Sequence, residues 1–184
     1  MAEEHLVFGQ ILEALYLRGL KGKLTSEHMS ALRKLGLDLE KPLLPAYSRK
    51  VVHECLMATC RMLYPDLPTS EAMYQVGKHV TPGQRSNFLG NAILTVVGLV
   101  GPHRTLERMT RTFRSTNNYM TVTLERAADT TYLLVLEPSN EYPSYMQAVI
   151  EDLLTVAGAK SLRVEVESHD KANGRCTYRI AWTK

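Results

Sequence analysis

The sequence has few cysteines and little net charge, and both features limit the classes of protein to which it can belong. Three of its 184 residues are cysteines, Cys55, Cys60 and Cys176, and this odd number argues against the disulfide framework of a secreted protein. The formal net charge of +3 is too small for an overall field that would draw the chain to nucleic acid or anionic lipid. We therefore expect reduced thiols and, at most, a local charged patch.

Long apolar runs are missing as well. The longest, residues 92–101, is about half as long as the roughly 20 residues that a membrane-spanning helix needs. The sequence opens with Met1-Ala2-Glu3-Glu4, which is acidic where a secretory signal is basic. These features predict a cytoplasmic protein that does not associate with membranes.

Catalytic and metal-binding motifs are also absent. The sequence has no Gly-x-Ser-x-Gly elbow, and its segment 98–101 lacks the glycine pattern and lysine of a phosphate-cradling loop. The spacings of His53, Cys55 and Cys60 do not place them on one helical face, so they do not predict a metal site. Cys176 is expected in the core. We predict no cofactor and no metal. No motif supports an enzymatic activity, which stays an open alternative.

The composition that is present suits a folded globular chain. Hydrophobic residues make up 45% and charged residues 22% of the sequence, close to the average of globular proteins and far from disordered ones. A chain of this length buries about 70% of its unfolded surface. The sequence predicts one domain over residues 1–184, with a helical portion at 1–116 and an α/β portion at 117–184.

Helical periodicity dominates the first portion. Apolar residues recur at helical spacing from His5 to Leu20, and Ser26 is a capping residue for a helix that Gly36 ends. Further helices are expected at 48–63, at 69–78, at 82–97 and at 103–113, with Gly101-Pro102 separating the last two.

The second portion changes to the alternation that is typical of strands. Residues 120–124 and 131–136 predict a hairpin, residues 143–158 a helix, and residues 161–167 and 175–183 a second hairpin. Asn173-Gly174 marks the turn of that second hairpin because it favours positive φ. The fold class is therefore α+β, an N-terminal helical block followed by a ββαββ antiparallel sheet region.

One face of the helix predicted at 103–113 concentrates arginine. At about 100° per residue, Arg104, Arg108 and Arg111 share a narrow sector, while Leu106, Met109 and Phe113 occupy the opposite side. The candidate ligand- or partner-binding residues are these three arginines together with Arg114, Asn117, Asn118 and Tyr119. Such a row suits a phosphate, a carboxylate-bearing ligand or an acidic partner surface. A solvated face, neutralised by Glu107 and Glu125, is the other interpretation.

Several short motifs occur in order along nearly the whole chain: Phe8 with Glu13-Ala14-Leu15, Gly36-Leu37-Asp38-Leu39, Leu63-Tyr64-Pro65 with Glu71-Ala72, Gly101-Pro102-His103-Arg104, and Phe113-Arg114-Ser115-Thr116-Asn117-Asn118-Tyr119. In these the chain resembles an uncharacterised family of paralogous proteins known mainly from myxobacteria. That family has no established activity, so the resemblance implies a domain of unknown function and no mechanism.

A second likeness covers the C-terminal end, through Gly158-Ala159, Asn173-Gly174-Arg175-Cys176-Thr177-Tyr178 and Trp182. This end is similar to the haem-dependent nitric-oxide sensors and to 4-vinyl-reductase-like small-molecule-binding domains. The likeness implies a ligand pocket between helices and a small antiparallel sheet. The Tyr-x-Ser-x-Arg haem signature is absent, because Tyr47-Ser48-Arg49 lacks its spacing, and no histidine is assigned as an axial ligand.

These observations favour a non-enzymatic regulatory or sensory domain that binds a small molecule or a protein partner. Two alternatives stay open: a phosphate-containing ligand, nucleotide or nucleic acid, bound through the arginine-rich helix face, and an enzyme of unrecognised chemistry. The isolated tyrosines do not form the basic and aromatic ladder of a single-strand nucleic-acid binder. A homodimer is also left open.

Overall fold

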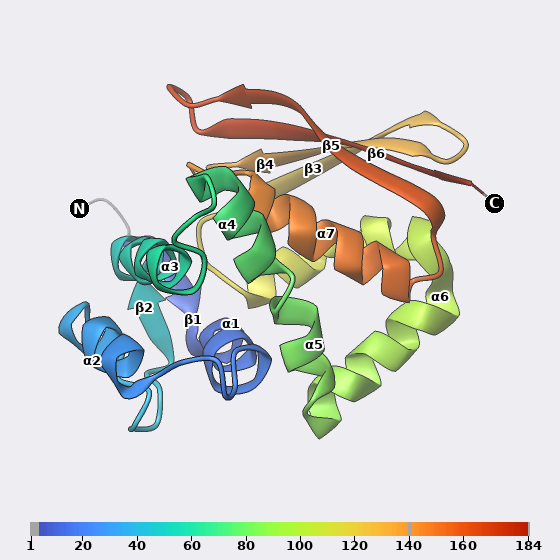
Figure 1. Ribbon diagram of the computed structural model, residues 1–184. Coiled ribbons are helices and arrows are strands. Elements are labelled where there is room, and N and C mark those ends of the chain that lie inside the picture. Colours follow the sequence, from blue (N-terminus) through green and yellow to red (C-terminus); the bar gives the residue numbers. More distant parts are fainter. Residues whose placement is uncertain (1–3, 140, 184) are drawn as a thin grey trace.

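The fold consists of a helical block and a four-stranded antiparallel sheet (Figure 1). The computed structural model describes residues 4–139 and 141–183. The α+β class predicted from the sequence is confirmed, with helices first and the ββαββ arrangement after them. The hydrophobic core is continuous and draws residues from both portions of the chain.

The chain begins with a strand where the sequence predicted a helix. Residues Leu6–Phe8 form β1, which pairs antiparallel with β2, Ala46–Ser48. The prediction of helix from His5 to Leu20 was therefore wrong for its first turn, because pairing with a segment distant in sequence overrides local periodicity. The remainder is helical, as the short α1, Gly9–Leu12, and the π-helix η1, Glu13–Gly19.

The next three helices follow the predicted boundaries closely. They are α2, Ser26–Lys34, α3, Arg49–Leu63, and α4, Thr69–Gly77. Thr25, and not Ser26, caps α2, because its hydroxyl accepts the His28 N–H while the His28 ring accepts the Thr25 N–H. Gly36 ends that helix with a φ of 102°, a conformation that favours glycine.

Two helices of unequal length follow. The short α5 covers Val80–Arg85, and α6 runs from Phe88 to Thr112 with a break at Gly101, whose φ of 76° and ψ of 172° are not helical. The break stands where Gly101-Pro102 was predicted to separate two helices. The first half of α6 is thereby free to run in a different direction from the second. A 3₁₀ turn, η2, Phe113–Ser115, ends this region.

The sheet comprises β3, Thr121–Ala128, β4, Thr131–Glu137, β5, Lys160–Asp170, and β6, Arg175–Thr183, in the order β3-β4-β6-β5. The helix α7, Ser144–Val156, connects its two hairpins. Along β6 the side chains of Cys176, Tyr178, Ile180 and Trp182 are buried, so the predicted inward face of this strand, including Cys176, is confirmed.

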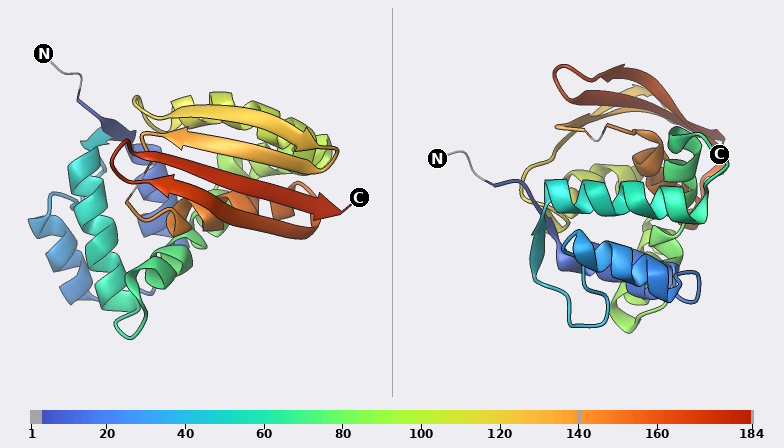
Figure 2. Two further views of the ribbon diagram at one scale, coloured as in Figure 1. Left: turned by 90° about the horizontal axis from the view of Figure 1, so that it is seen from above. Right: turned by 60° about the vertical axis from the view of Figure 1, so that its left-hand side comes forward.

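Helices cover only one face of this sheet. The helix α7 packs on β5 and against α4, and the second half of α6 approaches β3 (Figure 1). Two further views show the opposite face of the sheet free of other elements (Figure 2). Within the described residues, no helix is both long and apolar enough to cross a membrane.

Candidate functional site

A cavity of about 1040 Å³ lies among the helices. Its wall combines η1, one face of α3, the short α5, both halves of α6 and one side of α7. Among the described residues, none of the lining comes from the four strands of the main sheet. The pocket is therefore enclosed by helices, whereas the likeness at the C-terminal end implied a pocket between helices and the sheet.

The inner wall of the cavity is apolar and buried. Leu12 and Leu15 come from α1 and η1, Val80 from α5 and Met109 from α6, and all four are almost fully excluded from solvent. The flexible thioethers of Met73, Met109, Met120 and Met146 add a surface that adapts to irregular shapes.

The outer wall is apolar but exposed, and it comes from the first half of α6. Phe88 is 93% exposed, Leu89 69% and Ile93 54%, and each of them lines the cavity. Val96 belongs to the same wall. Exposed apolar patches of this kind mark ligand-binding grooves or interaction sites in folded proteins.

Apolar side chains supply most of the surface of this wall, and most of its polar side chains already have partners. Arg18 forms an ion pair of 2.7 Å with Glu13, and the Thr105 hydroxyl donates to the carbonyl of Gly101. Asn117 accepts the backbone N–H groups of Tyr119 and Met120. The cavity therefore offers a mostly apolar environment with little unsatisfied polar chemistry.

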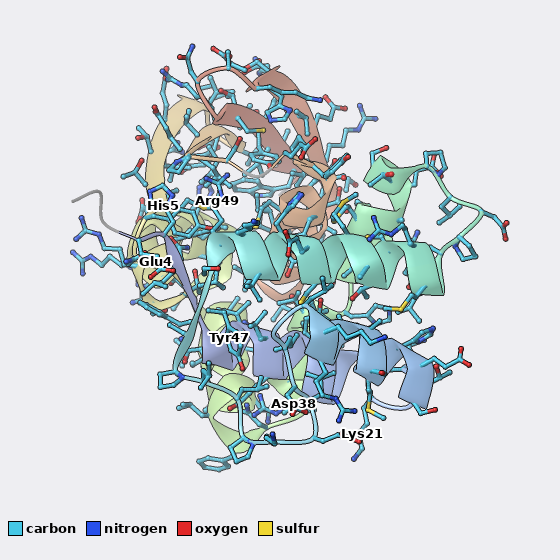
Figure 3. All side chains as sticks on the ribbon, turned by 90° about the vertical axis from the view of Figure 1, so that its left-hand side faces the viewer. Glu4, His5, Lys21, Asp38, Tyr47 and Arg49 are labelled. Atoms are coloured by element: carbon cyan, nitrogen blue, oxygen red, sulfur yellow. The ribbon has the colours of Figure 1, made fainter. Side chains whose placement is uncertain are left out.

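A polar cleft of about 600 Å³ adjoins the cavity at the beginning of α3. Its lining is Glu4, His5, Ser48, Arg49, Lys50, His53 and Glu141. Two of these residues, Arg49 and His53, also line the apolar cavity. In Figure 3, Glu4 and His5 lie beside Arg49, where the segment that leads into β1 meets α3. We call these seven residues the polar cleft.

Arg49 is held in place from two sides. Its guanidinium donates to the carbonyl of Ser139 at 2.6 Å and lies over the ring of Tyr119, 5.3 Å from the ring centroid. His5 stacks on the same tyrosine ring with centroids 4.8 Å apart. Burial raises the pKa of the Tyr119 phenol, which therefore stays neutral beside the guanidinium.

His53 stands one turn further along α3. Its Nε2 lies 3.6 Å from a carboxylate oxygen of Glu141, and its ring stacks in parallel with that of Tyr142 at 6.5 Å. Both of these partners come from the segment before α7. The residues of the polar cleft are thus brought together from three separate parts of the sequence.

The arginine-rich helix face predicted from the sequence is present in the structure. Arg104, Arg108, Arg111 and Arg114 are exposed, while Leu106, Met109 and Phe113 are buried. Only Arg108 of the four lines the cavity. The structure forms no ion pair to any of the four within the residues it describes.

The other three predicted site residues do not join that face. Asn117 and Asn118 use their amides on the backbone, and Asn118 bonds the segment leading into β1 through the Leu6 N–H and the Glu4 carbonyl. Tyr119 belongs to the stack under Arg49. Whether these seven residues bind a ligand stays a prediction.

Sequence reasoning missed Arg49, His53 and His5. A signal for Arg49 and His53 was present in the sequence. One helical face of this segment is polar at its start and apolar further along, and it comprises Arg49, Val52, His53 and Leu56. The sequence predicts a helix at 48–63, but no site was predicted on this face. The pairing of β1 with β2, which brings His5 to Arg49, left no local signal.

Thiol chemistry has no place in this site. Cys55, Cys60 and Cys176 are free and buried. Burial raises the pKa of Cys55 to about 12 and that of Cys60 to about 11, so both remain thiols and not thiolates at neutral pH. Among the described residues no group of three histidine, cysteine or acidic side chains is close enough to hold a metal ion.

The family model with the description "Protein of unknown function (DUF2378)" matches residues 5–183. The chain belongs to this family. No curated protein matches it by sequence. The family resemblance noted in the sequence is thereby confirmed, whereas a myxobacterial origin stays a prediction.

Solved structures show the same fold at low sequence identity. The Fe(II) unliganded H-NOX protein from K. algicida is 12% identical, with a TM-score of 0.67 over 96% of this chain and 97% of that one. An oxygen-binding H-NOX domain related to soluble guanylate cyclases is 12% identical, with a TM-score of 0.65 over 96% and 95%. A structure from a study of heme distortion in the H-NOX family is 13% identical, with a TM-score of 0.64. The fold of this family member is thus H-NOX-like.

Haem does not fit the side chains that this cavity presents. Haem iron needs an axial histidine, thiolate or phenolate, or a thioether paired with a histidine. The one described histidine in the lining is His53, which is engaged by Glu141 and Tyr142 at the rim. His103 faces the sheet, where its Nδ1 is 3.0 Å from the Tyr132 hydroxyl and its ring meets Trp182 edge-on.

The tyrosine and methionine residues of the wall do not replace that ligand. Burial raises the pKa of Tyr145, so its phenol stays protonated in the cavity. The thioethers of the wall have no histidine opposite them within the described lining.

Proposed function

We propose that this chain is a non-enzymatic sensory domain that binds a small apolar molecule in the helix-enclosed cavity. The observation that carries the proposal is the first half of α6, which leaves large apolar side chains exposed along the rim of the cavity. Leaving such surface in water costs about 25 cal/mol for each Å². A bound apolar molecule recovers that free energy.

The dimensions and the fold support the same proposal. The cavity of about 1040 Å³ is at the upper end of the roughly 300–1,000 Å³ range of small-molecule sites, and such sites are mostly apolar with a few placed polar groups. The structures with the same fold include an oxygen-binding H-NOX domain. In this chain the ligand class follows from the lining, because the lining does not fit haem.

A pair of matched substitutions tests the cavity. Ile93 lines it, whereas Leu99 lies on the same half of α6, is 82% exposed, and is absent from its lining. We expect Ile93→Glu to weaken binding of the neutral fluorescent probe N-phenyl-1-naphthylamine by about tenfold or more, because a carboxylate in an apolar site disfavours an apolar ligand. Leu99→Glu should bind the probe like the unsubstituted chain.

Probe fluorescence measures the binding, and thermal melting checks that both variants fold. Both positions are exposed, so neither substitution should lower the melting temperature by more than a few degrees. Equal probe binding by Ile93→Glu and Leu99→Glu would show that the cavity is not the site. No fluorescence enhancement with the unsubstituted chain at all would remove the proposal.

A second candidate function rests on the arginine-rich helix face. Four exposed guanidiniums without an ion-pair partner in the described residues suit a phosphate-containing ligand, nucleotide or nucleic acid, or an acidic protein partner. An enzyme of unrecognised chemistry and a homodimer both stay predictions.

Salt dependence tests that second function. Binding of ATP or of a labelled single-stranded oligonucleotide should weaken steeply as salt is raised from 50 to 200 mM. Replacing Arg104 and Arg111 with Gln should abolish the binding and leave the melting temperature within about 1 °C, because both side chains are exposed. Salt-insensitive binding would speak against phosphate recognition here.

A further inference from the structure

The polar cleft and the apolar cavity adjoin along a single face of α3, where they share two lining residues. Arg49 and His53 line both, and the next residues on that face, Val52 and Leu56, line only the cavity. These positions follow the i, i+3, i+4, i+7 spacing of neighbours on a helix. A molecule that lies along this face therefore meets charge at one end and apolar surface over the rest.

The formal charges of the polar cleft balance when its two histidines are counted as neutral, because its lining holds two cations, Arg49 and Lys50, and two acids, Glu4 and Glu141. Lys50 lies 4.0 Å from Glu54, and His53 faces Glu141. Arg49 has no carboxylate within ion-pair distance among the described residues. Its guanidinium donates to the backbone carbonyl of Ser139, which accepts without neutralising the charge.

The N-terminal end of the helix adds partial positive charge beside Arg49. Arg49 is the first residue of α3, and the first turn of that helix contains no acid. Acidic side chains are the ones that stabilise this end of a helix, because its free N–H groups carry partial positive charge. An anionic group on a ligand would supply the negative charge that the first turn of the helix lacks.

We infer that the ligand is an amphiphile with one carboxylate, whose apolar chain fills the cavity and whose carboxylate binds Arg49. This deepens the proposed function and rests on it. A guanidinium presents two parallel N–H donors that match a planar carboxylate. The acids Glu4 and Glu141 in the same lining disfavour a dianionic head such as a phosphate, so a monoanion fits best.

A pair of ligands with the same chain tests this inference. Dodecanoate and dodecan-1-ol differ in the head group alone, and each is titrated against the protein loaded with N-phenyl-1-naphthylamine. We expect dodecanoate to displace the probe at about one tenth of the concentration that dodecan-1-ol requires, because its carboxylate gains a charge-assisted bond to Arg49.

The matched variants are Arg49→Gln and Arg61→Gln. Arg61 is exposed on the last turn of the same helix and lines neither hollow. Arg49→Gln should equalise the two ligands by weakening dodecanoate alone, while Arg61→Gln should keep the tenfold preference. If Arg49→Gln does not fold, the unsubstituted chain still tests the inference, since raising the salt should weaken dodecanoate relative to dodecan-1-ol.

The outcomes separate this inference from the proposed function. Equal displacement by the two ligands on the unsubstituted chain overturns the carboxylate assignment while leaving the apolar cavity in place. A preference that survives in Arg49→Gln assigns the carboxylate to another group and also overturns the inference. Failure of the probe and of both ligands to bind overturns the proposed function itself.

Discussion

At the scale of single residues, Asn118 joins the two ends of the helical block. Its Oδ1 accepts the Leu6 N–H at 2.8 Å, and its Nδ2 donates to the Glu4 carbonyl at 3.0 Å. Its own N–H donates to the Leu6 carbonyl. The strand β1 has only three residues, so these bonds add to the few that its pairing with β2 provides. They also hold His5, which precedes β1, in position over Tyr119.

Removing that amide should destabilise the fold. We expect Asn118→Ala to lower the free energy of unfolding by about 1–2 kcal/mol, since two backbone groups lose their partner. Asn118→Asp keeps the acceptor for Leu6 and loses only the donor, so its loss should be smaller. Urea denaturation measures both. Equal midpoints in all three chains would show that the side-chain amide of Asn118 does not stabilise the fold.

At the scale of elements, α5 and η1 contact each other backbone to backbone. A Cβ at Gly83 would overlap the carbonyl oxygen of Ala14, and a Cβ at Gly19 would overlap that of His79. Both helices line the cavity, so this contact fixes the distance between two of its walls. The π-helical winding of η1 is itself a form that recurs at functional sites.

Substitution of this contact glycine should separate the helices. We expect Gly83→Ala to destabilise the chain by about 1–3 kcal/mol, because an added methyl in a filled contact forces the backbones apart. Gly98→Ala is the matched control, since its Cβ would meet only Val156 at 3.4 Å, and alanine suits a helix better than glycine by up to about 1 kcal/mol. Thermal melting should therefore shift in opposite directions, and a shared direction would contradict the packing argument.

Elements were also the level at which sequence patterns predicted best. Gly101 and Gly174 both have the positive φ expected at a helix break and at a hairpin turn. The strands 131–137 and 175–183 were predicted almost to their ends, because the alternation along each is determined by one buried face. The strand β1 was missed because its partner lies at Ala46–Ser48, beyond the reach of a local pattern.

At the scale of the whole molecule, the H-NOX-like arrangement retains a ligand-sized cavity without the side chains that haem requires. The histidine of the Gly-Pro-His-Arg motif, His103, packs against Tyr132 and Trp182 under the sheet. From the same helix, Thr105 and Met109 line the cavity, and His103 does not. The ligand class is therefore proposed from the residues of the site, since function follows these residues and not the fold.

The sequence by itself determined the α+β class, the order of the longer helices and of the four strands of the main sheet, and the arginine-rich face of 103–113. Each of these depends on residues that are near one another in the sequence. The tertiary structure alone decided that Arg49, His53, His5 and Tyr119 would meet beside an apolar cavity. These residues lie just before β1, on α3 and just before β3. Their meeting depends on contacts between distant segments, and such contacts are selected by the packing of the whole chain and not by any local period.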